Sequence, residues 1–393
     1  MVSERTRMEG LSIKQRFQET LKSVYFPFVA IVVSLLFGSV VILATSSTSP
    51  LTAYGHMLKG AFGSIAAFDS TLIKAIPLIF TALSFSLARR SGIINLGAEG
   101  QFMMGALAAT AVGVATPNLP AIIHLPATLL AGFLGGALFG LITGVLKVKF
   151  GASELIITIM LNYIAKELIS YFVNGPLMDS ASSSYPQSAP MEPSARLYKF
   201  IPGLNVHTGL LIALAFIFLY YFFLWKTTAG FDMRVVGFNP SAGAYAGMSI
   251  GRSTILALFL AGGLAGLGGC IEIIAVQGRL MMTSFAVPYG FTGIAVALLG
   301  NLNPLGVLFS GILFGGLSAG ALRMEVMTRD VSSSVAVVIQ ALIILFIAGR
   351  QMFAFKRRYR YRPSSEKRKG KTVVDDATED ESPTVQATAG EGE

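Results

Sequence analysis

The side chains best placed to take part in chemistry lie in the run Ser91–Gln101, SGIINLGAEGQ, directly after the pair Arg89-Arg90. This run puts Asn95, Glu99 and Gln101 at the start of an apolar segment. Glu99 would lie about 6 Å into a helix that begins at Asn95, because each helical residue rises 1.5 Å. A carboxylate in or near lipid is costly and must face protein or water. We expect Glu99 to be a gate or packing anchor on a solute path, or else to pair with one of the two arginines at the membrane surface.

A second set of polar residues occurs in the apolar run Glu154–Ala165, ELIITIMLNYIA. Glu154, Thr158 and Asn162 are four residues apart, so a helix would place them on one face. A neutral polar face inside a membrane bundle suits an uncharged, hydroxyl-rich solute on a translocation path. The alternative is that these side chains hydrogen-bond to a neighbouring helix.

A third candidate lies in the run Tyr289–Pro304, YGFTGIAVALLGNLNP, where glycines and a proline interrupt the apolar pattern. We expect a short or broken helix here, and we place Phe291 and Thr292 among the candidate path residues. The Phe291 ring could stack on a sugar or a base. The alternative is an aromatic side chain in the core.

The chain lacks the residue patterns of an enzyme. It has no G-x-x-x-x-G-K-[ST] loop, so it cannot bind ATP by that route. Its one cysteine, Cys270, rules out a disulfide within the chain, and its histidines are far apart in the sequence. We therefore expect no catalytic residues, no metal site and no cofactor on this chain. Energy for transport must come from another subunit or from an ion gradient.

The composition predicts an all-α polytopic membrane protein. The 393 residues are 53% hydrophobic and only 13% charged, and the apolar runs are too long for the strands of a membrane barrel. We expect about ten spans, the first of them a retained span rather than a removed export signal. The expected spans are Phe26–Ala44, Thr71–Ala88, Asn95–Ala115, Ala121–Leu146, Glu154–Val173, Gly209–Trp225, Ser253–Ala275, Phe291–Asn301, Pro304–Leu322 and Val331–Ala348.

The charges predict which ends of the spans face the cytoplasm. The net charge is +9, and the basic residues gather at the chain ends and in short loops, which is the positive-inside pattern. We therefore place both termini in the cytoplasm, with a basic segment at 1–25, a transmembrane domain at 26–349 and a tail at 350–393. The tail is basic and then acidic with few apolar residues, so we expect it to be disordered. Its basic block favours contact with anionic lipid headgroups over nucleic acid.

The order of the spans has the parity of an inverted repeat. Spans two to five start outside and spans seven to ten start inside, so the two sets run in opposite directions. Such repeats place the solute path at the interface of the halves near the bilayer midplane. Three spans also carry small residues four apart, which allow the close backbone contact that holds membrane helices together. These residues are Gly132, Gly136 and Gly140; Ala261, Ala265 and Gly269; and Gly311, Gly315 and Ala319.

A polar, glycine-rich segment, Thr227–Ile250, separates the apolar runs Gly209–Trp225 and Ser253–Ala275. Its turn residues, its Asn239-Pro240 step and its small residues favour a short helix on the cytoplasmic membrane surface, docked against a partner chain. An ordinary amphipathic loop is the alternative.

The same segment resembles the coupling segment of permease subunits in ATP-binding-cassette importers of the branched-chain amino acid, ribose and nucleoside group. It matches the pattern G…R-x-x-G-x-N-P-x-A-x-x-x-x-G. The run Ser91–Gln101 resembles the signature G-x-x-N-x-G-x-E-G-Q of the simple-sugar and nucleoside branch, and the runs that begin at Glu154 and Tyr289 also resemble that branch. The matching positions are Gly230, Arg234, Gly237, Asn239, Pro240, Ala242 and Gly247 in the first pattern, and Gly92, Asn95, Gly97, Glu99, Gly100 and Gln101 in the second.

The resemblance implies the permease subunit of an ATP-driven importer for a nucleoside or simple sugar, in a bacterial cytoplasmic membrane. It implies a cytoplasmic ATPase subunit that holds ATP and Mg²⁺, an extracellular substrate-binding lipoprotein and a second, related permease subunit. Residues 226–252 would receive the movement of the ATPase. The alternative is an ion-coupled secondary carrier of a small polar solute, whose uptake would survive loss of the ATPase. The candidate path residues are Asn95, Glu99, Gln101, Thr158, Asn162, Phe291 and Thr292.

Overall fold

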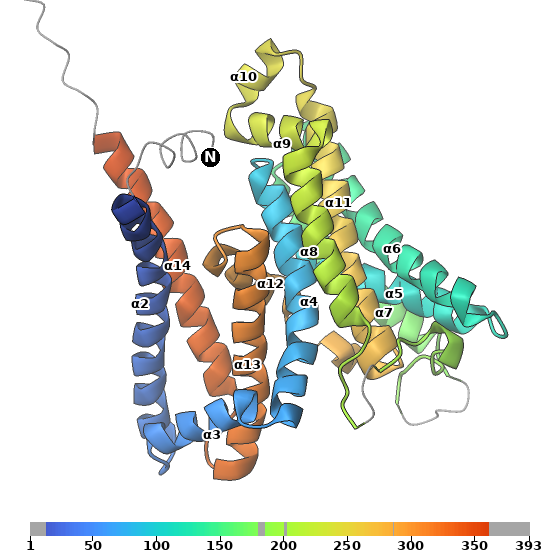
Figure 1. Cartoon of the computed structure of the whole chain (residues 1–393). Coiled ribbons are helices and arrows are strands. Elements are labelled where there is room, and N and C mark those ends of the chain that lie inside the picture. Colours follow the sequence, from blue (N-terminus) through green and yellow to red (C-terminus); the bar gives the residue numbers. More distant parts are fainter. Residues whose placement is uncertain (1–12, 180–184, 200–202, 286, 361–393) are drawn as a thin grey trace, which may run out of the picture. The chain divides into compact units, whose positions relative to one another are not determined.

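The computed structural model describes residues 13–179, 185–199, 203–285 and 287–360, and the chain divides into two compact units, residues 1–350 and 351–393. The predicted tail from residue 361 onward, and the first twelve residues of the basic N-terminal segment, lie outside the described residues. Where the chain is described it forms helices and three isolated β-bridges but no strand, which confirms the all-α class. Figure 1 shows the helices. They are α2 (Ile13–Thr45), α3 (Pro50–Phe62), α4 (Ile65–Arg90), α5 (Ala98–Ala115), α6 (Ala121–Phe150), α7 (Glu154–Asn174), η1 (Pro193–Ala195), α8 (Gly209–Lys226), α9 (Thr228–Phe238), α10 (Pro240–Tyr245), α11 (Ile250–Ile271), η2 (Glu272–Gln277), η3 (Met282–Phe285), α12 (Tyr289–Leu299), α13 (Pro304–Thr328) and α14 (Ser334–Arg360).

Eight segments of the described chain are apolar and long enough to cross a membrane, which confirms a polytopic membrane protein. Two of the ten expected spans are not among them. The helix α5 begins at Ala98 rather than at Asn95, and its first turn is polar because it holds Glu99 and Gln101. In α14 the apolar stretch covers only Ser334–Ile347 of the part described. The expected short helix after residue 288 is α12, with 11 residues.

The helix α3 was not predicted from the sequence. Its start is fixed locally, because the Ser49 hydroxyl accepts a hydrogen bond from the Thr52 N–H and Pro50 occupies the first turn. It packs against α2, α4 and α13 at the end of these helices opposite to α9 and α10 (Figure 1). At 13 residues it is too short to cross the membrane.

One exposed carboxylate, Asp330, holds the turn before α3. Its Oδ2 atom accepts hydrogen bonds from the N–H groups of Ser47 and Thr48, both at 3.1 Å, and its Oδ1 atom accepts one from the Thr48 hydroxyl at 2.7 Å. These donors, above all the Thr48 hydroxyl, lower the pKa of Asp330 below its ordinary value.

We expect Asp330→Ala to lower the unfolding temperature Tm of the purified protein by about 1 to 2 °C at pH 7, because the site is solvent-exposed. A carboxylate with a lowered pKa stabilises the fold above its ordinary pKa, and that contribution is lost as the pH falls through the folded-state pKa. The Tm difference between wild type and Asp330→Ala should therefore be largest at neutral pH and shrink below about pH 4. A difference that grows on acidification would contradict this assignment.

Small residues bring the central helices together, as the stripes predicted. On α6, a Cβ atom at Gly136 would collide with the Gly262 carbonyl of α11, and one at Gly140 with the Leu258 carbonyl. On α13, a Cβ atom at Gly315 would lie 2.6 Å from the Thr71 carbonyl oxygen of α4. These stripes are helix-packing surfaces, which is how helices associate where lipid surrounds them.

The two halves of the bundle pack in the same way. The helix α4 packs against α11 at the centre; α4 also packs against α12 and α13, while α11 packs against α5 and α6. Exchanging α4 with α11, α5 with α12 and α6 with α13 leaves these contacts unchanged, and this is the pattern that the predicted inverted repeat requires. The equivalent helices α5 and α12 also touch, so they meet at the interface between the halves.

Candidate functional site

The coupling segment, residues 226–252, forms two helices, α9 and α10, and not the single short helix that we predicted. The Thr227 hydroxyl caps α9 by accepting from the Gly230 N–H at 3.2 Å. At Asn239 the backbone turns extended, with φ −150° and ψ 99°, and the Asn239 side chain caps α10 by accepting from the Ala242 N–H at 3.2 Å. Pro240 then fills the first position of α10, where its missing N–H costs nothing. The Asn239-Pro240 step therefore starts a second helix.

The two helices bury one side and expose aromatic rings on the other. Met233 and Val236 are buried, whereas Phe238 is 89% exposed and Tyr245 is 94% exposed. Ala242 and Gly247, which the resemblance assigned to coupling, are exposed beside Tyr245. Large exposed rings among small residues are typical of a surface that binds a protein partner.

Two glycines press α9 onto the ends of α4 and α8. A Cβ atom at Gly230 would lie 2.7 Å from the Leu224 Cα atom of α8. A Cβ atom at Gly237 would collide with the Arg90 carbonyl and would lie 2.7 Å from the Gly92 nitrogen. Gly92 itself has φ +80°, a left-handed conformation that glycine adopts without strain. The coupling segment is thus in backbone contact with the run that leads to Glu99.

The Arg234 side chain lies against the Trp225 ring of α8 and the half-exposed Phe231 ring of its own helix. Its guanidinium carbon lies 5.9 Å from the centre of the Trp225 ring and 5.9 Å from that of Phe231, and its Nε atom donates to the Gly230 carbonyl at 3.4 Å. Burial lowers the pKa of Arg234 below its ordinary value, and the nearby charge of Arg90 lowers it further. Arg234 therefore fastens α9 to α8.

The candidate path residues before and in α5 form a closed polar cluster. The Asn95 amide donates to Gln101 Oε1 at 2.9 Å, and Asn95 Oδ1 accepts from the Gly97 N–H at 3.0 Å. Asn162 of α7 joins the cluster, because its Oδ1 accepts from the Gly100 N–H at 2.8 Å and its amide donates to the Leu96 carbonyl at 3.0 Å. Asn162 thus joins α7 to the start of α5, whereas Asn95 and Gln101 bond to each other within that run.

Glu99 contacts α12, so the predicted alternative of a surface ion pair with Arg89 or Arg90 is wrong. Its side chain is buried, and its Oε2 atom accepts a hydrogen bond from the Gly290 N–H at 2.6 Å. A Cβ atom at Gly290 would lie 2.6 Å from the Glu99 Cα atom, so only glycine permits this approach. A carboxylate at the first turn of a helix is electrostatically favourable. Glu99 is therefore a packing anchor between equivalent helices of the two halves.

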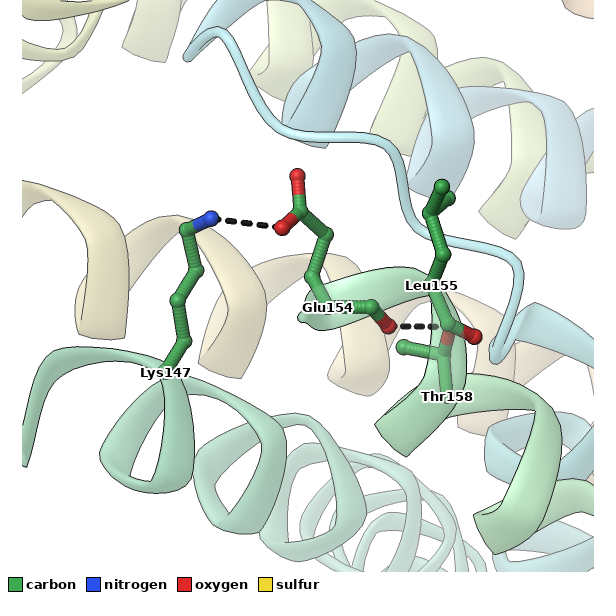
Figure 2. A network of polar contacts seen from close by, with 4 residues as sticks. All are labelled: Lys147, Glu154, Leu155 and Thr158. Atoms are coloured by element: carbon green, nitrogen blue, oxygen red, sulfur yellow. Dashed lines mark hydrogen bonds and ion pairs between the residues drawn. The ribbon is translucent and has the colours of Figure 1, made fainter. Parts of the chain in front are cut away.

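The face formed by Glu154, Thr158 and Asn162 is not an open polar surface. The Glu154 carboxylate pairs with Lys147 of α6 at 2.6 Å, and the Thr158 hydroxyl turns back to the Glu154 carbonyl of its own helix, also at 2.6 Å (Figure 2). Thr158 is fully buried, and a Cβ atom at Gly97 would lie 3.1 Å from it. The alternative, hydrogen bonding to a neighbouring segment, holds for Glu154 and Asn162, whereas the Thr158 hydroxyl bonds within its own helix.

Phe291 and Thr292 lie in the first turn of α12, directly after the Glu99 contact. Phe291 is 44% exposed and Thr292 is half-buried, so the alternative of a core aromatic for Phe291 is wrong. The buried ring at this point is Tyr289, whose centre lies 5.4 Å from that of Phe102 on α5.

Two groups of residues escaped the sequence analysis. Phe102 and Tyr289 pack beside the Glu99–Gly290 contact, and the buried carboxylate Glu272 is held by the Gln277 amide at 3.3 Å. A carboxylate within the apolar run at residue 272 was a usable signal. Arg90 and Trp225 are the second group, and no spacing in the sequence joins them.

Comparison with known proteins decides the family. Residues 67–348 match the family described as the permease component of the branched-chain amino acid transport system. The chain belongs to this family. It is a transport component and a multi-pass protein of the cytoplasmic membrane.

Several relatives are similar to this permease over most of its length. The guanosine ABC transporter permease protein NupP of Bacillus subtilis is 35% identical over 337 residues, 85% of this chain and 96% of the relative. The glucose ABC transporter permease protein TsgB13 of Haloferax volcanii is 36% identical over 90% of this chain and 93% of its own. The nucleoside ABC transporter permease protein NupB of Lactococcus lactis is 34% identical over 83% of this chain and 91% of its own.

Bacillus subtilis also has a second relative, the guanosine ABC transporter permease protein NupQ, which is 28% identical over 61% of this chain and 76% of its own. No solved structure matches the permease.

Proposed function

We propose that this permease forms the translocation path of an ATP-driven importer and carries a nucleoside or a simple sugar. The observation that carries the proposal is the coupling segment. It exposes Phe238 and Tyr245 outward, and through Gly237 it presses on the backbone that leads to Glu99. A displacement of this segment by a partner would therefore reach the interface between the two halves of the bundle. The printed names of the relatives, guanosine, nucleoside and glucose permeases, support the choice of solute.

The partners follow from this assignment. A separate ATP-binding-cassette ATPase would hold ATP and Mg²⁺ and contact α9 and α10, while this chain would bind no cofactor and catalyse no reaction. An extracellular substrate-binding lipoprotein would deliver the solute. The presence of two differently named relatives, NupP and NupQ, in one organism favours a second permease subunit that is a related but different chain.

The solute would pass where the equivalent helices α5 and α12 meet. Once this contact opens, Phe102 and Tyr289 would offer aromatic faces, and Glu99 and Gln101 would offer carboxyl and amide groups. Aromatic faces with neutral and acidic hydrogen-bonding groups suit a hydroxyl-rich, uncharged ring compound. The candidate path residues Asn95, Thr158, Asn162, Phe291 and Thr292 would line or support this region.

Reconstitution tests the proposal. The permease, its partner permease, the ATPase and the binding protein are placed in liposomes, and uptake of radiolabelled guanosine and glucose is measured with and without ATP. We expect one of these solutes to be taken up only when ATP is present, and we expect an ionophore to leave this uptake unchanged. Uptake that proceeds without ATP and collapses with an ion gradient would establish the secondary carrier instead.

A further inference from the structure

The short helix α12 is held at both ends by polar side chains from one stretch of chain, residues 90–99. At its start, the Gly290 N–H donates to the Glu99 carboxylate at 2.6 Å. Beyond its end, the Arg90 guanidinium donates from Nη2 to the Leu302 carbonyl at 3.1 Å and to the Asn301 carbonyl at 3.4 Å. The hydrogen-bond acceptor is at the N-terminal end, where the helix has free N–H groups, and the cationic donor is at the C-terminal end, where it has free carbonyl groups.

The turn that Arg90 holds has an unusual backbone. Asn301 and Leu302 both have left-handed conformations, with φ of 53° and 55°. Residues other than glycine rarely adopt this backbone conformation, and two in succession need support from their surroundings. The close approach of Gly300 to Gly306 packs the turn against the start of α13, and the Arg90 guanidinium binds its carbonyls. If Arg90 is displaced, this turn must therefore either move with it or lose the hydrogen bonds that Arg90 donates to its carbonyls.

Arg90 also contacts Trp225, the α8 residue against which Arg234 of the coupling segment packs. Its guanidinium carbon lies 5.6 Å from the centre of the Trp225 ring, and Arg234 of α9 lies 5.9 Å from the same ring. Trp225 is the only tryptophan in the chain, and Tyr221 stacks on it with ring centres 5.4 Å apart and planes at 21°. A chain of contacts thus runs from α9 through Trp225 and Arg90 to the turn between α12 and α13.

We propose that Arg90 is a positioning residue that transmits movement of the coupling segment to α12. Displacement of α9 shifts Trp225 and Arg90, and Arg90 draws the Asn301–Leu302 turn with it. Because Glu99 holds the opposite end of α12, the helix is displaced as a unit within the interface between the halves. The inference rests on the proposed function, since it supplies the route by which ATPase movement reaches the path.

The test uses the complete importer in liposomes and compares Arg90→Gln, Arg90→Lys and Arg89→Gln. Arg89 is the matched control, because it is the adjacent arginine and is exposed. For each complex three quantities are measured: assembly with the ATPase, ATP hydrolysis stimulated by the loaded binding protein, and solute uptake. The decisive quantity is the number of ATP molecules hydrolysed per solute imported, which a purely structural defect would leave unchanged because hydrolysis and uptake would fall together.

We expect Arg90→Gln to assemble and hydrolyse ATP, while uptake falls about tenfold and ATP per solute rises in proportion. Arg90→Lys should recover part of the uptake, because lysine keeps the charge and a donor but not the planar group that covers the Trp225 ring. Arg89→Gln should resemble wild type. An unchanged ATP-per-solute ratio in Arg90→Gln, or the same rise in Arg89→Gln, would overturn the proposal.

If Arg90→Gln does not assemble, Trp225→Phe takes its place, because it keeps an aromatic ring under both guanidinium groups. A smaller rise in ATP per solute is then expected, and no rise would overturn the proposal. The wild-type complex separates the two claims. If it shows no ATP-dependent uptake, the proposed function fails, whatever the Arg90 variants do.

Discussion

Gly237→Ala is expected to lower solute uptake about a hundredfold while the permease still folds and still binds its ATPase. The added Cβ atom would collide with the Arg90 carbonyl and lie 2.7 Å from the Gly92 nitrogen, and both are backbone atoms that cannot rotate away. The end of α9 must therefore lift off the run that leads to Glu99. The measurement is ATP-driven uptake in liposomes, alongside co-purification of the ATPase.

The control for this prediction is Gly55→Ala on α3. No atom lies within 4 Å of a Cβ built at Gly55, so the same chemical change there meets open space. The exposed rings of Phe238 and Tyr245 are unchanged in Gly237→Ala, so ATPase binding should persist. If Gly237→Ala transports as well as Gly55→Ala, contact between α9 and the run after α4 has no part in coupling.

Glu99→Ala should have the second-largest effect, on both uptake and stability. It leaves the buried Gly290 N–H without its carboxylate partner, which typically costs about 1 to 3 kcal/mol. We expect uptake to fall at least about tenfold and Tm to fall by several degrees. Glu99→Gln, whose amide oxygen can still accept from the Gly290 N–H, should have an uptake and a Tm between those of wild type and Glu99→Ala.

The matched control is Glu154→Ala, which removes a glutamate of a different kind. Glu154 is only half-buried and pairs with Lys147 near the end of α6, and such surface pairs contribute about 0 to 1 kcal/mol. Tm is measured by thermal unfolding of the purified protein, and solute uptake is measured in liposomes. Equal effects of Glu99→Ala and Glu154→Ala would show that the Glu99–Gly290 contact is unimportant.

Local patterns predicted the features that local forces determine. Apolar runs located most spans, and residues four apart located the surfaces by which α6, α11 and α13 pack, because lipid-embedded helices associate only where backbones approach. The polar segment between two spans was also predicted to be helical, and it forms α9 and α10 between α8 and α11. The Asn239-Pro240 step was visible in the sequence, yet the second helix that it starts was not predicted. Such a step can end a helix or begin one, and here the hydrogen bond from the Ala242 N–H to the Asn239 side chain begins one.

The partners of buried polar groups could not be read from the sequence. Glu99 lies beside two arginines in the chain, but its partner Gly290 is 191 residues away. Arg90 binds Leu302, 212 residues away, and packs on Trp225. These pairings depend on how the halves of the bundle meet. The helix α3 was missed for a different reason, since a short helix fixed mainly by its cap has no long apolar run to reveal it.

Cross-linking of a cysteine at Tyr245 tests the central claim most directly, that the partner ATPase acts on α9 and α10 from the cytoplasmic side. The only native cysteine, Cys270, is buried, so Tyr245→Cys introduces the one accessible thiol of the described chain. A bifunctional thiol-to-amine reagent should join Tyr245→Cys to the ATPase, and a membrane-impermeant thiol reagent added outside intact cells should not label it. Tyr198→Cys, in the loop between α7 and α8, should behave in the opposite way. External labelling of Tyr245→Cys, or cross-linking of the ATPase to Tyr198→Cys alone, would contradict the account.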